Sequence, residues 1–353
     1  MDSIRLAHGG GGLETSLLIK EIFTPAFGDL LPKSPEDSLA FCLPGTCLTS
    51  TDSFIIDPPF FEGGDIGKLS VCGSANDVDM MGGRPAFINI GFIIEEDFSL
   101  KDLKKIAMSI ASTCRDGGVR ILSADTKVLP RFSKTRPSIF INTTCIGHQQ
   151  KTGIGVKNIK HGDALIVSAS LGSHGASIFL AQNNIDLHHN LQSDCANLYP
   201  MLDPLFASDI DLHAMRDATR GGLAAVLNEW AQESNICIEV KEESLPMQNE
   251  VRGVCEILGL DPLSLANEGV CVIALQESKA REALDILRRH PLGRQASIIG
   301  LARGDFKDAS LRPDGLESGE LDSVCFRRVV LKTNYGSQRF LEYPEGELLP
   351  RIC

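Results

Sequence analysis

The chain ends in a cysteine, Cys353, within the terminal sequence Pro350 to Cys353. A thiol with no residue after it and no apolar run around it is not explained by packing in a core. Its unperturbed pKa is about 8.5, so a small fraction is thiolate at neutral pH, which is enough for a thiol that receives an acyl group. Arg351 would favour the thiolate, and the adjacent terminal carboxylate would oppose it.

The other cysteines give no such signal. The chain has 11 Cys, an odd number, at irregular spacing and without a CxxC pair or a Cys/His grouping typical of a zinc site. We expect most of them to be free thiols in a reducing compartment. Cys145 and Cys271 lie in apolar, strand-like segments and Cys255 in a helical one, so we expect these three to fill the core.

Aspartates beside small residues recur at the ends of apolar segments. Carboxylates in this setting are the hard oxygen ligands that magnesium needs when it bridges a protein to phosphates. Each cluster taken alone is more typical of a helix cap or a turn than of a metal site. The clusters are Ser50 to Ser53, Ala75 to Asp79, Ala124 to Lys127 and Asp217 to Gly222.

Four consecutive glycines, Gly9 to Gly12, follow His8 and precede a plausible helix. Such a run loses much backbone entropy on folding, so close approach to a phosphate is one use for it. An irregular terminus is the other interpretation, and the missing Lys-Ser/Thr excludes a Walker loop.

Two further residues could support chemistry on a phosphate or a proton. Lys127 follows Asp125 by two residues and could neutralise charge on a transferring phosphoryl group, although a solvated surface lysine is more common. Glu268, between Asn267 and Gly269, precedes a buried strand. It indicates either a turn or a carboxylate placed for acid-base work.

Composition excludes several classes. With 34 Lys and Arg against 46 Asp and Glu the net charge is -12, which argues against a nucleic-acid binder. No apolar run is long enough to span a bilayer, so we expect no membrane partner. The first residues, Met1 to Leu6, lack the features of a secretory signal, and we expect a cytoplasmic protein.

The elements that must position these residues divide the chain into two halves and a tail. Apolar periodicity predicts strands and helices over residues 1–150, and the pattern restarts with a second domain over residues 151–334. From Tyr335 the apolar period disappears, so we expect residues 335–353 to form a mobile tail that carries Cys353. The predicted strands are Cys47 to Phe54, Phe87 to Ile94, Ile121 to Ala124, Ile139 to Gly147, Ile236 to Val240 and Val270 to Leu275. The predicted helices are Ser70 to Met81, Leu100 to Gly117, Ala224 to Trp230, Pro246 to Leu258 and Lys279 to Arg289.

In their order along the chain, these residues resemble the family that includes aminoimidazole ribonucleotide synthetase and selenophosphate synthetase. Within it, the tail is similar to that of the proteins that mature hydrogenases. One departure is Ala124, where the family commonly has Gly. The matching segments are Ala7 to Gly9, Ser50 to Ser53, Asp57-Pro58, Gly63 to Leu69, Asn76 to Val78, Asp125 to Val128, Phe140 to Thr143, Leu171 to Ala176, Arg216 to Gly222, Val251 to Glu256, Ala266 to Gly269 and Pro350 to Cys353.

The resemblance implies an α/β (α+β) fold of two domains. Its N-terminal domain would supply strands to a β-barrel shared across a homodimer, beside a C-terminal α+β domain. ATP and Mg2+ would bind at the junction, with the metal held by Asp52, Asp77, Asp125 and Asp217. The remaining nucleotide contacts would come from Gly10, Gly11, Asn76 and Thr219.

The implied activity is ATP-dependent dehydration of a carbamoyl group on Cys353 to a thiocyanate, which supplies cyanide to a hydrogenase iron centre. Glu268 would act as the base and Lys127 as the cation beside the phosphate. A carbamoyltransferase would load the thiol, and an iron-carrying scaffold complex would accept the cyanide. The alternatives are a selenophosphate synthetase-like enzyme, which is expected to carry an N-terminal Cys that this chain lacks before Cys42, and a non-catalytic assembly factor.

Overall fold

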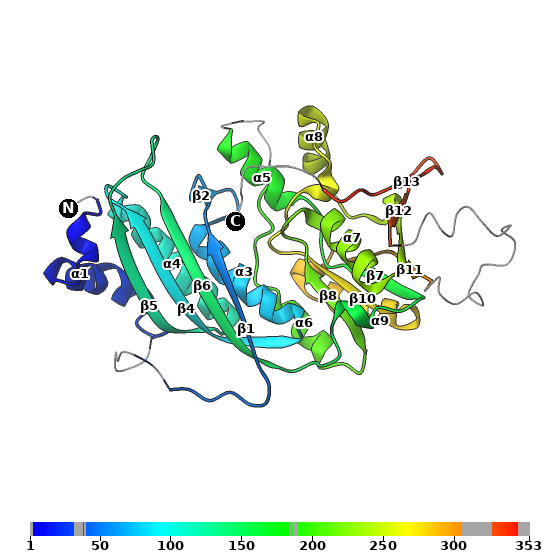
Figure 1. The fold of residues 1–353 in the computed structure, drawn as a ribbon, viewed down its shortest axis with the longest axis horizontal. Coiled ribbons are helices and arrows are strands. Elements are labelled where there is room, and N and C mark those ends of the chain that lie inside the picture. The colour runs from blue at the N-terminus through cyan, green and yellow to red at the C-terminus, as the bar shows by residue number, and fades with distance from the viewer. Residues whose placement is uncertain are drawn as a thin grey trace, which may run out of the picture.

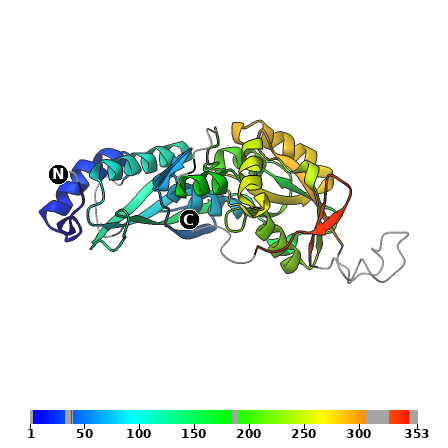
Figure 2. The same cartoon turned by 90° about the horizontal axis from the view of Figure 1, so that it is seen from above.

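The computed structural model of the chain describes residues 3–31, 38, 40–183, 185, 190–304 and 327–344. These residues form two halves, each built on its own β-sheet. The halves follow each other along the long axis of the molecule (Figure 1 and Figure 2). The N-terminal half has a four-stranded sheet and the C-terminal half a seven-stranded one.

The N-terminal half covers one face of its sheet with helices and leaves the other face open. The strand order is β1-β6-β4-β5, and α3 packs against β1, β6 and β4, with α4 beside α3. Its helices are α1 (Leu13–Leu18), α2 (Thr24–Phe27), α3 (Ile66–Met80) and α4 (Leu100–Gly117). Its strands are β1 (Cys47–Phe54), β2 (Phe60–Phe61), β3 (Gly64–Asp65), β4 (Gly83–Glu95), β5 (Arg120–Leu129) and β6 (Ile139–Gln149).

Helix α4 shows how local sequence fixes an element. Ser99 precedes it and its side-chain oxygen accepts a hydrogen bond from the Asp102 N–H at 3.2 Å, which satisfies a free donor of the first turn. The helix ends at Gly118, whose positive φ of 67° suits glycine. Residues spaced by three and four along it are buried, and they place α4 against the core of the half. They are Leu103, Ile106, Ala107, Ile110 and Ala111.

The C-terminal sheet is buried on both faces. Its order is β13-β12-β9-β11-β7-β10-β8, antiparallel except for β12 beside β9. In β7, Leu165 and Val167 pack in the cluster that contains α7, whereas Ala164 and Ile166 pack in the cluster that contains α6 and α9. A strand that is covered on both faces is expected to be a continuous apolar run, and residues 164–167 of β7 are one. The strands are β7 (Asp163–Val167), β8 (Leu212–Asp217), β9 (Cys237–Lys241), β10 (Cys271–Gln276), β11 (Ser297–Arg303), β12 (Val329–Lys332) and β13 (Gln338–Phe340). The helices are α5 (Ser173–Gln182), α6 (Tyr199–Phe206), α7 (Gly222–Ser234), α8 (Asn249–Leu258) and α9 (Glu277–Arg288).

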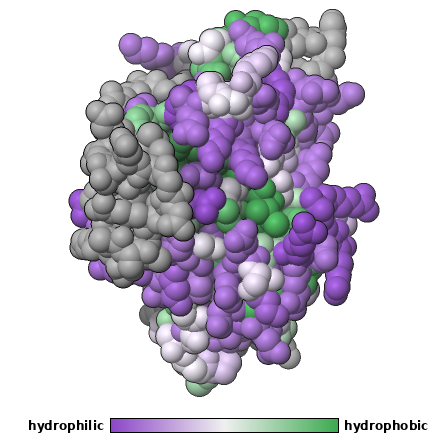
Figure 3. Space-filling model, turned by 90° about the vertical axis from the view of Figure 1, so that its right-hand side faces the viewer, coloured by the Kyte–Doolittle hydropathy of each residue, from purple (hydrophilic) through white to green (hydrophobic). Residues whose placement is uncertain are grey.

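The two halves meet where α3 contacts β8, an edge strand of the C-terminal sheet. The outer face of the C-terminal half is mainly hydrophilic, with hydrophobic residues exposed in small areas (Figure 3). Among the described residues, no helix combines the length and the apolar character needed to cross a membrane.

The predicted two-domain α/β organisation is confirmed. Each predicted strand and helix is present, Cys47–Phe54 and Leu100–Gly117 with the predicted ends and the others with shifted ends. β5, for example, continues to Leu129 through the polar residues after Ala124. The predicted start of the tail at Tyr335 is wrong. β13 pairs with β12, and Leu341 is buried, so the chain through Pro344 belongs to the C-terminal fold. The apolar signal of this short edge strand is too small to stand out from its polar neighbours.

The buried stripe of α4 predicts a matched pair of stabilities. Ile106→Ala should lower the free energy of unfolding by about 2 to 5 kcal/mol, because it removes a fully buried side chain from a packed core. Met108→Ala, on the exposed side of the same helix, should change it by no more than about 0.5 kcal/mol. Urea unfolding followed by circular dichroism measures both, and equal losses would contradict the assignment of the core face.

Candidate functional site

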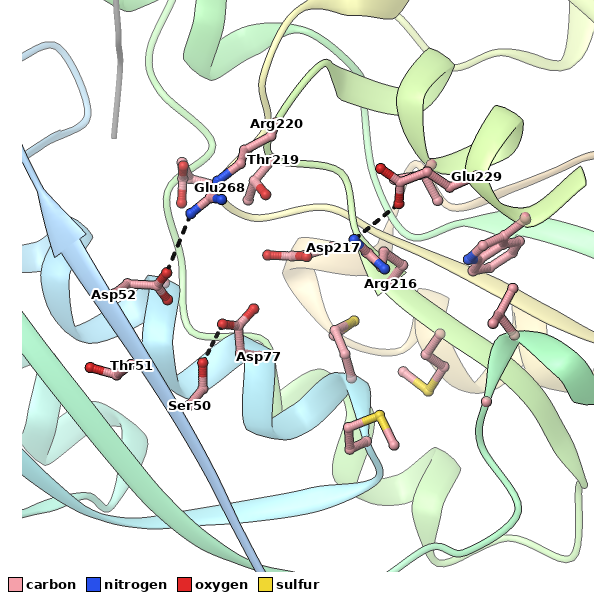
Figure 4. Close-up of a pocket in the computed structure, with 18 of the residues that line it drawn as sticks. Ser50, Thr51, Asp52, Asp77, Arg216, Asp217, Thr219, Arg220, Glu229 and Glu268 are labelled. Carbon is pink, nitrogen blue, oxygen red and sulfur yellow. Dashed lines mark hydrogen bonds and ion pairs between the residues drawn. The ribbon is translucent and has the colours of Figure 1, made fainter. Parts of the chain in front are cut away.

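A cavity of about 920 Å³ lies at the junction of the two halves. Its walls come from β1 and α3 of the N-terminal half and from β8, α7 and the turn between them in the C-terminal half (Figure 4). A volume of this size is typical of a site for a cofactor or another small molecule.

Besides Glu229 on α7, four carboxylates from four separate segments line this cavity: Asp52 on β1, Asp77 on α3, Asp217 at the end of β8, and Glu268 in the loop before β10. Figure 4 shows the labelled side chains gathered around one space. Ser50 Oγ donates to Asp77 Oδ2 at 2.5 Å, and Arg220 approaches Asp52 at 3.7 Å. Residues from three of the four acidic clusters of the sequence therefore meet here.

Close packing of α3 against β1 brings Asp77 to the cavity. A Cβ on Gly73, one turn before Asp77, would stand 2.7 Å from the Phe54 ring, so only glycine allows this approach. On the neighbouring face Thr143 Oγ1 donates to the Ser70 carbonyl at 2.8 Å. The small residues of the helix, which the sequence places on one face, thus bring the helix close to the sheet.

Burial and mutual repulsion raise the pKa values of three of these carboxyls, those of Asp52, Asp217 and Glu268. Desolvation, followed by the charge of Asp77, raises the pKa of Asp52 to about 6. Desolvation and the same neighbour raise the pKa of Asp217 to about 7. Burial raises the pKa of Glu268 well above its usual range. The cavity thus holds more acidic groups than it can ionise without cost, so a cation bound there would be favoured.

Basic and apolar residues complete the walls, and the sequence alone did not single them out. Arg216 forms an ion pair with Glu229 at 3.0 Å, and Tyr343 Oη donates to the other oxygen of Glu229 at 3.1 Å. Arg220 has its weak contact with Asp52 and is otherwise exposed. Arg216 and Arg220 flank the recognised Asp217 and Thr219, whereas nothing local marks Glu229 or Tyr343. The apolar part of the lining comprises Met80, Met81, Val156, Met215, Val226 and Trp230.

Asn76, a predicted nucleotide contact, is buried behind the cavity instead of lining it. Its Nδ2 donates to the carbonyls of Ala196 and Glu268 at 3.0 and 3.2 Å, and its Oδ1 accepts from the Leu198 N–H at 3.0 Å. It therefore ties α3 to two segments of the other half. Thr219, the other predicted nucleotide contact of this region, lies in the cavity wall.

The other predicted residues form a second group at the far edge of the N-terminal sheet. Lys127 Nζ lies 2.8 Å from Asp125 Oδ2, and both side chains are largely exposed on β5. Asp125 pairs with Gly91 of β4, and Gly91 pairs with Asn142 of β6, so the three residues lie on the same face of the sheet. Because Asn142 is exposed, this is the open face. Asp52, in contrast, is on the opposite edge strand and pairs with the buried Thr143.

The glycine run lies near the same edge. A Cβ on Gly9 would stand 2.7 Å from the backbone N of Val128 on β5, and Gly10 and Gly11 follow directly. We name Gly10, Gly11, Asp125 and Lys127 the β5-edge group. Within one chain this group does not line the cavity.

Cys353 lies outside the described residues, which end at Pro344. The root of the tail, however, is at the cavity: Tyr343 lines it, and Asn228 Nδ2 on α7 donates to the Leu341 carbonyl at 2.9 Å. Among the described residues, no group of three or more His, Cys, Asp or Glu side chains is arranged to hold a metal ion by itself.

Comparison with known proteins gives matches over most of the chain. Residues 38–149 match the N-terminal domain model of AIR synthase related proteins, and residues 160–310 match the C-terminal one. The carbamoyl dehydratase HypE of Escherichia coli K12 is 40% identical, with all of both chains covered.

Solved structures agree. A hydrogenase maturation protein HypE crystallised in complex with ATP matches with a TM-score of 0.86 at 37% identity, covering 99% of each chain. A HypE–HypF complex matches with a TM-score of 0.75 at 35% identity, covering 95% of this chain and 100% of that one.

The raised pKa of Asp217 predicts a pH-dependent effect on stability. A carboxyl whose folded-state pKa lies above its unfolded value costs stability as pH rises through that interval, here from about 4 to about 7. Asp217→Asn removes this cost, so its melting temperature should exceed the parental value by several degrees above pH 7 and by less towards pH 4. Scanning calorimetry across this range measures the difference.

Asp125→Asn is the matched control, since Lys127 lowers the pKa of this exposed aspartate. Its melting temperature should stay at or slightly below the parental value at neutral pH. A uniform gain at all pH values for Asp217→Asn, or an equal gain for Asp125→Asn, would contradict the electrostatic description of the cavity.

Proposed function

Because the chain belongs to the carbamoyl dehydratase HypE family, we propose that it uses ATP to dehydrate a carbamoyl group on Cys353 to a thiocyanate, the source of cyanide for a hydrogenase iron centre. The observation that carries this proposal is the acidic cavity between the halves, with the root of the tail in its wall. It combines a site for a nucleotide with a route for the terminal thiol.

The two ends of the cavity differ as a nucleotide requires. The apolar lining around Trp230, Met80 and Met215 suits a base, and the carboxylates of Asp52, Asp77 and Asp217 suit the phosphate end through a bound cation. The raised pKa values of Asp52 and Asp217 fit a site completed by Mg2+, which typically takes one or two carboxylates together with phosphate oxygens. When bound, Mg2+ would neutralise phosphate charge.

The turn from Asp217 into α7 adds positive charge beside these carboxylates. Gly221 and Gly222 have φ values of 66° and 60°, a conformation that suits glycine and lets the chain turn sharply at the start of α7. Helix N-termini attract anions, and Arg220 lies next to this one with its guanidinium largely exposed. We assign both to the phosphates of ATP.

In the proposed reaction, the oxygen of the carbamoyl group leaves as part of inorganic phosphate. The carbamoyl oxygen attacks the γ-phosphorus of ATP and ADP leaves, so a poor leaving group becomes a phosphate ester. Loss of the two nitrogen protons and cleavage of the C–O bond then give Cys353–S–C≡N and inorganic phosphate. Glu268, with its raised pKa, is a suitable base for these protons.

The tail can reach this chemistry from its own root. Pro344 is the last described residue and precedes Cys353 by nine residues. It lies close to Gly221, since a Cβ on Gly221 would stand 3.4 Å from Pro344 Cγ. Nine residues span at most about 30 Å when extended. Cys353 of the same chain can therefore enter the cavity without displacement of the C-terminal fold.

A homodimer explains the separation of the β5-edge group from the cavity. The open face and the two free edges, β1 and β5, leave backbone groups that a second sheet could pair with. Pairing of β1 with β5 of a second copy would close a barrel of both sheets. It would bring the partner subunit's Lys127 and the partner subunit's Asp125 to the β1 side of the cavity, where Lys127 can serve as the phosphate-side cation.

Two partners follow from the reaction. A HypF-like carbamoyltransferase would load Cys353, in keeping with the HypE–HypF complex among the similar structures. An iron-carrying scaffold of the HypC–HypD type would accept the cyanide, since a thiocyanate retained on the enzyme would block further turnover.

The tail cysteine gives the first functional prediction. Cys353→Ala should abolish product while ATP binding and the fold remain, because the thiol carries the group that reacts. Intact mass after incubation with the carbamoyltransferase, carbamoyl phosphate and ATP should show a gain of about 43 Da and then a loss of about 18 Da in the parent only.

The control is Cys255→Ser on α8, which removes a buried thiol remote from the cavity lining and should still be modified at Cys353. Modification of any other cysteine in the parent, or cyanide transfer by Cys353→Ala, would contradict the proposal.

The shared site predicts complementation between inactive variants. Asp77→Asn should disable the cavity and Lys127→Ala the β5-edge group, each with a folded dimer. Mixed dimers contain one site with both residues intact, so co-refolding the two variants should restore about a quarter of parental turnover by random pairing. Phosphate release measures it. A site within one chain would give no recovery above the separate variants.

A further inference from the structure

The main chain of Glu268 is held from two sides by side chains that the reaction does not otherwise use. Asp194 Oδ1 accepts the Glu268 N–H at 2.9 Å, and Asn76 Nδ2 donates to the Glu268 carbonyl at 3.2 Å. The two side chains come from different halves of the molecule, the loop before α6 and helix α3. They fix one peptide segment between them.

The segment that carries Asp194 is itself anchored at several points. The Ser193 N–H donates to the Glu62 carbonyl at 2.8 Å, and Asn76 bonds the Ala196 carbonyl and the Leu198 N–H at 3.0 Å each. An aspartate on such a segment has a fixed position relative to both sheets. It can act as a rigid support for a neighbouring residue.

The carboxyl of Asp194 is buried against the Glu268 turn. Burial raises its pKa to about 7, and hydrogen bonds from the N–H groups of Glu268 and Gly269 oppose this rise. A Cβ on Gly269 would stand 1.9 Å from the Asp194 carbonyl, so the two main chains are in direct contact and only glycine fits. The contact leaves the turn little freedom to shift.

The side chain of Glu268 depends on this support. Its carboxylate lines the cavity, and none of the described residues makes a hydrogen bond to it. A base without side-chain partners is oriented mainly by its own backbone, and a misplacement of about 1 Å can cost about 100-fold in rate. The residue that fixes the backbone then sets the geometry of the base.

We propose that Asp194 is a positioning residue for dehydration: through its hydrogen bond to the Glu268 N–H it holds the base towards the carbamoyl nitrogen. This inference rests on the proposed function, in which Glu268 removes the nitrogen protons. Asp194 itself is assigned no contact with ATP or with the carbamoyl group.

The test is the rate of dehydration of preloaded, carbamoylated protein, followed by intact mass. Asp194→Ala should lower kcat by about 10- to 100-fold while KM for ATP stays within about twofold. Asp194→Asn keeps an acceptor oxygen of the same reach and should recover most of kcat. If Asp194→Ala does not fold, Asp194→Ser, whose side chain is too short to reach the Glu268 N–H, carries the same expectation.

Asp261→Ala is the matched control. Its carboxylate accepts the Leu263 N–H at 2.9 Å, an equivalent bond in the same loop region, but without contact to Glu268. This variant should keep parental kcat. If loosening of the loop alone lowered kcat, Asp261→Ala would lose activity as well.

A double-mutant cycle completes the test. If Asp194 acts through Glu268, then Asp194→Ala adds no further loss to Glu268→Ala. A full additional loss there, parental kcat in folded Asp194→Ala, or a loss confined to KM for ATP would overturn the proposal. Absence of ATP-dependent dehydration in the parent would instead refute the proposed function.

Discussion

The structure depends on an electrostatic constraint, the placement of four carboxylates at one junction where water is partly excluded. Asp52, Asp77, Asp217 and Glu268 come from both halves. Burial raises the pKa values of Asp52, Asp217 and Glu268, and Arg220 offsets this only by a distant ion pair with Asp52. Packing must hold them there against repulsion. Gly73 against Phe54 and Asn76 across the junction provide that packing. A site held in this way fits the proposed binding of ATP with magnesium, whose charges would complete it.

Much of this could be predicted because the relevant signals are local. Apolar period gave the elements of both halves, and Asp or Glu beside small residues marked Asp52, Asp77, Asp217 and Glu268 before any contact was known. Element ends were less certain because strands such as β5 continue through polar residues on an open face. The strand near Phe340 was missed because it is short and at an edge.

The rest of the site could not be inferred from local pattern. Glu229 and Tyr343 meet Arg216 only through tertiary packing. Asp194 is one of several polar residues in its loop, and nothing local distinguishes it from them. Asn76 was recognised by its motif, yet its amide faces the protein interior instead of the cavity. The β5-edge group was expected in the site, and the single chain places it on another strand and face. The homodimer proposed above would reconcile these two observations.

In the proposed reaction, ATP removes the oxygen of the carbamoyl group on Cys353 as phosphate. Carbamoyl phosphate labelled with 18O at its carbonyl would load Cys353 with a labelled carbamoyl group, and the phosphate released after addition of ATP would be analysed by mass spectrometry. The expected result is inorganic phosphate heavier by about 2 Da, labelled in the same proportion as the carbamoyl group on Cys353. Unlabelled phosphate, with the label recovered in water, would contradict it.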